Sequence, residues 1–177
     1  MEWYNEPPSW SVFDNIITVT SAHGSDFWRK THYGFIRDNG HFYFQPVAGD
    51  FVCEVKIIGQ YSSLYDQAGL MVRADETTWM KTGIEYVEGV QHVSAVVTRD
   101  YSDWSVVPLP ENPPALWLRV TRTSGSLEVH YSLDGKQYAL LRVTYLAPGP
   151  VNVGVMCASP DGPGFSTTFE GFVVHGA

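Results

Sequence analysis

A long run of alternating side chains between residues 67 and 98 constrains the fold of this chain more than any other feature. Within it, Met80 and Ile84 alternate with Lys81 and Glu85. Successive side chains of a β-strand point to opposite faces, so one set faces a core and the other set faces away from it. The run therefore predicts three consecutive antiparallel strands with one apolar face and one polar face.

The same pattern predicts how these strands pair. A three-residue hairpin loop at 75–77 places Gln67 opposite Glu85, and a four-residue turn at 87–90 places Glu85 opposite His92. Both registers bring apolar side chains together on one face, which is what fixes register when that face is buried. The other face then collects a polar set, with glycines that leave room above the backbone: Gln67, Arg73, Trp79, Lys81, Glu85 and His92.

Turn signals recur about every 8–12 residues in the rest of the chain, which is typical of a β-sandwich or barrel. We expect about twelve strands in one domain spanning residues 1–177 and no helix longer than a turn or two. Residues 1–15, which contain two consecutive prolines, are expected to form an irregular segment packed on this domain. Residues 21–40 show neither periodicity and are predicted to be a long loop, a kind of segment that is often functional. The strands expected outside 67–98 are 16–20, 41–44, 51–58, 101–106, 116–123, 127–133, 138–144, 151–158 and 165–175.

Composition narrows the class of partner. The 177 residues are 44% hydrophobic and 17% charged, and they carry a net charge of −8. Nucleic acid and anionic membrane surfaces both require basic protein surface, so neither is expected as a partner. No apolar run is long enough for a membrane-spanning helix, and the first residues lack the pattern of a signal peptide. Cys53 and Cys157 lie in apolar strand contexts, which predicts buried free thiols in a cytoplasmic protein.

Sequence signatures of metal and cofactor sites are weak. The six histidines show no His-x-His spacing, and no Cys-x-x-Cys pair occurs. Asp134-Gly135 and Asp161-Gly162 are better explained as turns than as calcium loops. No Gly-x-Ser-x-Gly motif is present for a nucleophilic serine. We therefore expect no metal and no cofactor.

Several phrases in the sequence resemble domain-of-unknown-function family 1349, which includes the yeast regulator-of-enolase protein. They are DFWRKTHYGF (26–35), DQAGLMVR (66–73), WMKTGIEY (79–86), SDWS (102–105), YSLDG (131–135) and GVMCASP (154–160). The resemblance runs from about residue 10 to the C-terminus. It implies an all-β fold, a concanavalin A-like jelly-roll sandwich of two curved antiparallel sheets. Superfamily relatives use the concave face of this fold for sugars or peptides.

Together these observations favour a binding module for a carbohydrate or another small polyhydroxylated ligand. Sugar rings present C–H faces to aromatic side chains and hydroxyls to charged and amide groups. The candidate ligand-binding residues are Lys81, Glu85, Gln67, Arg73, Trp79, His92, Trp28, Arg29, Asp103 and Trp104. The same residues would also fit a solvated polar ladder beside buried core tryptophans.

Two alternatives remain open. A glycoside hydrolase or lyase would use Glu85, but hydrolysis requires a second carboxyl group. Asp103 shares the face of Glu85 in only one of two possible registers. Glucanases of the superfamily carry acidic residues alternating along one strand, where this chain has Lys81 and Gly83. The other alternative is a protein-interaction or regulatory module of metabolism, whose partner would contact exposed aromatic loops.

Overall fold

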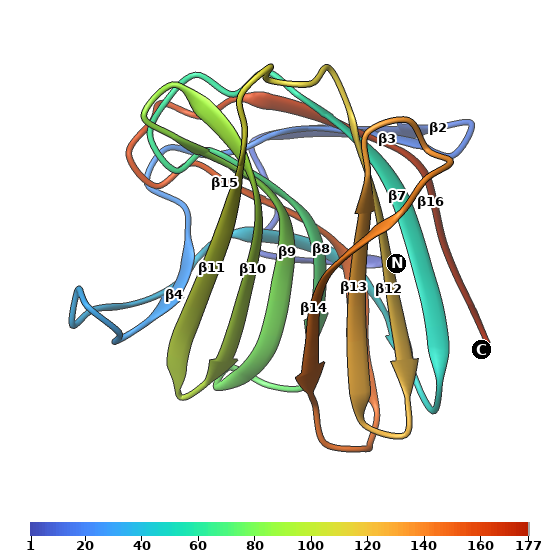
Figure 1. Ribbon diagram of the computed structural model, residues 1–177. Helices are drawn as coiled ribbons and strands as arrows, with labels where there is room; N and C mark the ends of the chain where they lie inside the picture. The colour runs from blue at the N-terminus through green and yellow to red at the C-terminus, as the bar shows by residue number, and fades with distance from the viewer. Residues whose placement is uncertain (177) are drawn as a thin grey trace.

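The computed structural model describes residues 1–176, and over that range the chain forms sixteen strands and no helix (Figure 1). Two antiparallel sheets of seven strands pack face to face, and a short two-stranded hairpin lies outside them. Figure 1 shows β8–β11 curving along one side of the molecule and β12–β14 with β7 and β16 along the other. The all-β sandwich expected from the sequence is confirmed. No helix in the described range is long and apolar enough to span a membrane.

The order of strands in each sheet differs from their order in the chain. The first sheet runs β1 (Glu2–Tyr4), β6 (His41–Val47), β15 (Val151–Ala158), β8 (Gln67–Arg73), β9 (Thr78–Val87), β10 (Val90–Arg99) and β11 (Tyr101–Leu109). The second sheet runs β14 (Ala139–Tyr145), β13 (Ser126–Ser132), β12 (Leu116–Thr123), β7 (Phe51–Gly59), β16 (Ser166–Gly176), β3 (Ile16–Thr20) and β2 (Ser9–Phe13). The hairpin consists of β4 (Phe27–Arg29) and β5 (Ile36–Asp38).

The main hydrophobic core lies between the two sheets. In β7, Cys53 and Val55 are buried in this core, whereas the alternating Glu54 and Lys56 are not. Burying one large aliphatic side chain stabilises the fold by about 1.5–3 kcal/mol relative to leaving it exposed. Cys53 and Cys157 are free and fully buried, and burial raises the pKa of the Cys53 thiol to about 12. Both thiols are therefore structural groups of the core.

The predicted register of the central strands is confirmed. Gln67 pairs with Glu85 across β8 and β9, and Glu85 pairs with His92 across β9 and β10. The second turn is shorter than expected, because residues 87 and 90 already pair with each other. Glu88 and Gly89 form it with φ angles of 50° and 85°, the left-handed conformation that two-residue hairpin turns require.

Two glycines of these strands have a different role from the one expected. Gly69 and Gly83 pair directly across β8 and β9. A Cβ atom at Gly69 would lie 1.8 Å from the Thr82 carbonyl oxygen, and one at Gly83 would lie 2.0 Å from the Ala68 carbonyl oxygen. The glycines are therefore needed because the two backbones approach closely, and the prediction that they leave room above the backbone is wrong.

Residues 1–15 are not irregular, as the sequence had suggested. β1 pairs with β6 at an edge of the first sheet, and β2 pairs with β3 at an edge of the second. Trp3 packs on Tyr43 with ring centroids 4.8 Å apart, whereas every side chain of β2 is exposed. An exposed edge strand has no alternating burial, so hydrophobic periodicity does not reveal it. Pro7 and Pro8 separate the two strands, which lets a short segment contribute to both sheets.

Candidate functional site

The outer face of the first sheet, which carries the polar set, is partly covered. Residues 21–40, called the covering segment below, cross this face and contain the β4–β5 hairpin. Phe27 and Trp28 of the hairpin pack with Met71 and Trp79 of the sheet in a second hydrophobic cluster. Phe27 is completely buried and Trp79 is 1% exposed. The predicted loop is therefore a folded layer, held to the sheet by apolar contacts.

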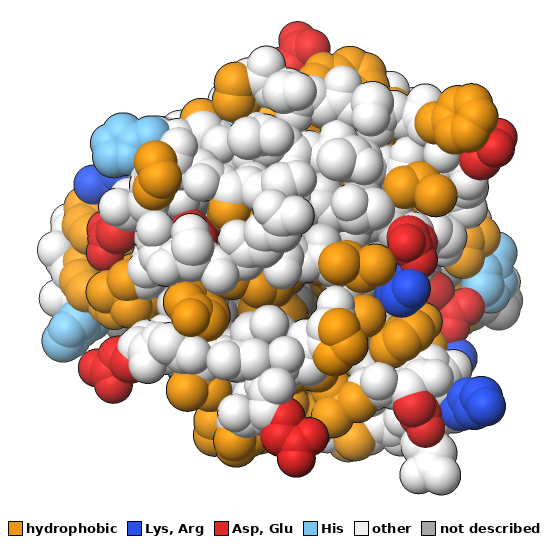
Figure 2. All heavy atoms as spheres, turned by 90° about the horizontal axis from the view of Figure 1, so that it is seen from above, with side chains coloured by type: hydrophobic (Ala, Val, Ile, Leu, Met, Phe, Trp, Pro, Cys, Tyr) orange, Lys and Arg blue, Asp and Glu red, His pale blue; other side chains and the backbone are white. Residues whose placement is uncertain are grey.

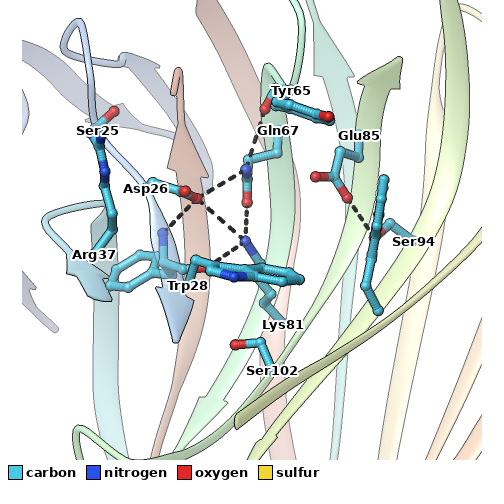
Figure 3. A network of polar contacts seen from close by, with 12 residues as sticks. Ser25, Asp26, Trp28, Arg37, Tyr65, Gln67, Lys81, Glu85, Ser94 and Ser102 are labelled. Carbon is cyan, nitrogen blue, oxygen red and sulfur yellow. Dashed lines mark hydrogen bonds and ion pairs between the residues drawn. The ribbon is translucent and has the colours of Figure 1, made fainter. Parts of the chain in front are cut away.

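Polar contacts fasten the covering segment at its centre (Figure 3). The Lys81 ammonium donates hydrogen bonds to the Phe27 carbonyl oxygen, at 2.8 Å, and to Gln67 Oε1. Its Nζ also lies 3.7 Å from Asp26 Oδ1, while Gln67 Nε2 donates to the same oxygen at 3.4 Å and to the Tyr65 carbonyl at 3.2 Å. Lys81 and Gln67 thus use most of their hydrogen-bonding capacity inside the protein.

Glu85 lies beside this network and is less fully bonded. Ser94 Oγ donates to Glu85 Oε2 at 2.9 Å, and Trp104 Nε1 donates to Ser94 Oγ at 3.3 Å. Oε1 of Glu85 receives no hydrogen bond from the described residues. Burial raises the pKa of the Glu85 carboxyl, although the charge of Lys81, the hydrogen bond from Ser94 and the neighbouring indole N–H of Trp104 act in the opposite direction. Burial outweighs them because no cation pairs directly with this carboxylate in the described structure.

A cavity of about 240 Å³ opens between the covering segment and the sheet. We call it the sheet cavity, and its lining residues are Asp26, Trp28, Tyr33, Phe35, Arg37, Tyr65, Gln67, Lys81, Glu85, Trp104, Pro160 and Asp161. The hydroxyls of Tyr33 and Tyr65 lie 3.2 Å apart, which joins two of its walls and raises the pKa of Tyr65 to about 12. The volume is below the roughly 300–1,000 Å³ typical of drug-sized ligands, so the cavity suits a ligand of about one sugar ring.

Half of the candidate residues inferred from the sequence line this cavity. Trp28 and Trp104 contribute aromatic walls, and Gln67, Lys81 and Glu85 contribute polar groups from β8 and β9. Trp28 was expected from the loop, Trp104 from the edge strand and the others from the central strands. The structure brings these three separate regions together.

The other candidates lie elsewhere. Arg73 forms a two-pronged ion pair with Asp38, at 2.7 and 2.9 Å, and Arg29 pairs with Asp100 at 2.9 Å. Trp79 belongs to the second hydrophobic cluster. His92 is half-buried and its Nδ1 contacts the Val90 carbonyl of its own strand.

Asp103 does not share the face of Glu85. In the observed register Trp104 pairs with Val96, and Val96 pairs with Lys81, so Trp104 points to the outer face. Asp103 pairs with Val97 and therefore projects from the opposite side of the sheet. The second carboxylate beside Glu85 comes from Asp26 of the covering segment. Sequence periodicity could not reveal it, because Asp26 lies outside any long strand.

The cavity also contains residues that the sequence analysis did not select. They are Asp26, Tyr33, Phe35, Arg37, Tyr65, Pro160 and Asp161. Four of the first five positions lie in the covering segment, and its length was the one signal that pointed to them. Among the described residues, no group of three or more His, Cys, Asp or Glu side chains is arranged to hold a metal ion.

Comparison with known proteins places the chain. The family described as "Protein of unknown function (DUF1349)" matches residues 3–176. The chain belongs to this family. Regulation of enolase protein 1 of Saccharomyces cerevisiae is 41% identical over 172 residues, which is 95% of this chain and 85% of that protein. The crystal structure of a functionally unknown protein from Saccharomyces cerevisiae has a TM-score of 0.95 at 37% identity, covering 99% of this chain and 96% of that one.

More distant structures share the fold alone. The GH43 protein BlXynB of Bacillus licheniformis matches with a TM-score of 0.69 at 15% identity, over 97% of this chain and 36% of that one. A legume lectin-like domain from Entamoeba histolytica matches with a TM-score of 0.63 at 11% identity, over 99% of this chain and 90% of that one. The lectin/glucanase-like sandwich expected for this member of the family is confirmed.

Proposed function

We propose that this protein is a carbohydrate-binding module whose sheet cavity takes one sugar unit of a neutral ligand. The observation that carries the proposal is the pairing of incompletely bonded carboxylates with aromatic walls in one cavity. Glu85 Oε1 and Asp26 Oδ2 accept no hydrogen bond from the described residues, and Trp28, Tyr65 and Trp104 line the same space. Carboxylate oxygens accept hydrogen bonds from hydroxyls, and aromatic rings pack against the C–H faces of a sugar.

The charges in the cavity support a neutral ligand. Asp26, Glu85 and Asp161 are acidic, whereas Lys81 and Arg37 are basic. Because the ammonium of Lys81 is already bonded to protein oxygens, it offers little to an anion. Its positive charge equally disfavours a cation. On the face seen in Figure 2, acidic side chains are spread widely and outnumber basic ones, which also disfavours an anionic polymer as the partner.

A second candidate function is glycoside hydrolysis, favoured by one observation. Glu85 has a raised pKa, as a general acid requires, and Asp26 supplies a second carboxylate in the same cavity. We favour binding without turnover, because the Asp26 carboxylate is held by the Phe27 amide at 2.7 Å and lies near Lys81. Those contacts engage one oxygen of the Asp26 carboxylate with the protein. A catalytic base or nucleophile would instead have to be free to reach a water molecule or a sugar carbon.

A regulatory role with a protein partner is compatible with the name of the yeast relative, regulation of enolase. Such a partner would find the apolar side chains exposed on and beside β2, where Phe13 is 75% exposed and Val12 49%. We also propose a cytoplasmic location, supported by the two free core thiols.

The test is a titration of neutral sugars by calorimetry, comparing the wild type with Glu85→Gln. We expect the wild type to bind at least one sugar and Glu85→Gln to lose at least tenfold in affinity, because the amide replaces one acceptor with a donor. Glu128→Gln, on the exposed side of β13, is the matched control and should bind as the wild type does. Equal affinity of wild type and Glu85→Gln for every sugar that binds would refute the site. Release of a shorter sugar by wild type but not by Glu85→Gln would establish the hydrolase instead.

A further inference from the structure

A second cavity lies on the far side of Trp28 from the polar network. Its volume is about 480 Å³ and its lining residues are Trp28, Thr31, His32, Tyr33, Ser102, Asp103 and Trp104. We call it the edge cavity, because β11, which contributes three of these residues, is the edge strand of the first sheet. Trp28, Tyr33 and Trp104 line both cavities. In Figure 3 the Trp28 ring lies between Ser102 on one side and Asp26 with Gln67 on the other.

We propose that the edge cavity is a second sugar subsite, so that the ligand is an oligosaccharide of at least two units that crosses the rim of Trp28. The inference rests on the proposed function of the sheet cavity and extends it. A single ring fills the sheet cavity, and a linked second ring would enter the larger and more open edge cavity. Trp28 and Trp104 would then contact consecutive sugar rings from between the two cavities.

The Trp28 ring, which separates the two cavities, is held in a fixed position. Trp28 Nε1 donates to the Thr31 carbonyl at 2.9 Å, which sets the orientation of the indole ring. Tyr33 meets Trp28 edge to face, with ring centroids 5.7 Å apart. A ring that is only 8% exposed yet borders two cavities offers narrow strips of each face to a ligand. Such a rigid aromatic surface can contact sugar without first becoming ordered.

The turn that forms the outer wall of the edge cavity is also held in place. Asp100 forms ion pairs with Arg29 at 2.9 Å and with Lys30 at 2.6 Å. The Thr31 amide donates to the Arg29 carbonyl and the Gly34 amide to the Lys30 carbonyl, each at 2.7 Å. Lys30 and His32 adopt φ angles of 57° and 62°. Non-glycine residues in this left-handed region are often found where a ligand site is built.

One polar group of the edge cavity has unused hydrogen-bonding capacity. Thr31 Oγ1 is buried and has no hydrogen-bond partner among the described residues. A buried hydroxyl without a partner is unfavourable, so a ligand hydroxyl that reached it would add affinity. The Thr31 hydroxyl supplies both a donor and an acceptor, which match a sugar hydroxyl.

The experiment measures affinity against chain length. Calorimetry compares xylose, xylobiose and xylotriose, then glucose, cellobiose and cellotriose, then mannose, mannobiose and mannotriose. The test variant is Thr31→Val, which keeps the shape of the side chain and removes the hydroxyl. Thr123→Val, at an exposed position of β12, is the matched control. Melting temperatures establish that each variant is folded.

In the series that the wild type recognises, we expect the disaccharide or trisaccharide to bind at least tenfold more tightly than the monosaccharide. Thr31→Val should lower the affinity for the longer sugars about three- to tenfold and leave monosaccharide binding unchanged. Monosaccharide and trisaccharide of equal affinity, with Thr31→Val behaving as wild type, would overturn the second subsite and leave the first intact. No binding of any sugar would refute the proposed function and the second subsite together. Loss of binding at every chain length in Glu85→Gln, alongside a chain-length-dependent loss in Thr31→Val, would support both cavities.

Discussion

Glu85→Gln should make the protein more stable at neutral pH while weakening ligand binding. The Glu85 residue is 8% exposed, and within the described structure no cation lies in direct ion-pair distance of its carboxylate. Removing an ion from water costs several kcal/mol, whereas a hydrogen bond to a charged group returns about 1.5–3 kcal/mol. Glutamine keeps the acceptor for Ser94 and removes the charge. Lys81 remains compensated by Asp26 and by its two hydrogen bonds, so the substitution strands no buried charge.

The net gain expected from these terms is about 1 kcal/mol at pH 8, which raises the melting temperature by about 2–4 °C for a chain of this size. The gain depends on pH in a defined direction. Because the pKa of Glu85 is raised in the folded state, that state holds its proton more tightly than the unfolded chain does. Wild-type stability from this group therefore falls as pH rises through the window between the ordinary value of 4.5 and the folded pKa. The advantage of glutamine is complete above that window and vanishes near its lower end.

Urea unfolding of the wild type and Glu85→Gln at pH 8, 6 and 4.5 measures this advantage. The exposed Glu128→Gln variant controls for the loss of one negative charge from an acidic protein. A Glu85→Gln protein less stable than wild type at pH 8, by an amount that does not change with pH, would refute the reasoning. In that outcome the carboxylate stabilises the fold, and its interaction with Lys81 outweighs its burial.

Two further predictions concern the covering segment and the acid stability of the fold. Lys81→Met should lower the free energy of unfolding by about 3 kcal/mol, because it leaves Asp26 without its buried cation; urea unfolding measures the loss, and hydrogen exchange should show a less protected Phe27 amide. Lowering the pH from 8 to 5 should destabilise the wild type through His41. Burial lowers the pKa of His41 from the ordinary 6.5, and in the neutral form its Nε2 accepts a hydrogen bond from the Ala22 amide at 2.9 Å. The folded state then binds fewer protons than the unfolded chain, so this contribution is complete above 6.5 and is lost as pH falls toward the lower folded value. His41→Gln should flatten the pH dependence of the urea midpoint in this range, and an unchanged slope would contradict the assignment.

The central sheet could be predicted from the sequence because its information is local. Alternation fixes which side chains share a face, and the requirement for one apolar face fixes the register of Gln67 with Glu85. The exposure of that face could not be predicted in the same way. Trp79 and Lys81 alternate with core residues as solvent-facing side chains would, yet both are buried because Phe27, more than fifty positions earlier in the chain, packs over them. A period of two specifies a side of the sheet, and long-range packing decides what covers it.

The same distinction applies to the predicted site: strand register could be predicted for some of its residues, whereas contacts with the covering segment could not. Glu85 and Gln67 belong to the cavity because their strands place them there, and sequence reasoning about strands was sufficient. Arg73 was selected by the same reasoning, but Asp38 of the covering segment forms an ion pair with it. Asp26 was missed because an irregular segment has no register from which to infer a direction. Partners contributed by such a segment become visible only in three dimensions.

The covering segment also explains why a polar strand face can carry few free donors and still line a cavity with polar and aromatic walls. Lys81 and Gln67 hold the segment in place, and the segment in turn contributes Asp26, Trp28 and the wall of the edge cavity. Under the proposed function, ligand specificity would reside mainly in residues 26–35, whereas β8 and β9 would supply the support and one acceptor, Glu85. A relative with the same strand residues and a different covering segment should therefore keep this fold and bind a different sugar. The lysine on β9 would be retained in it for its role in anchoring the segment.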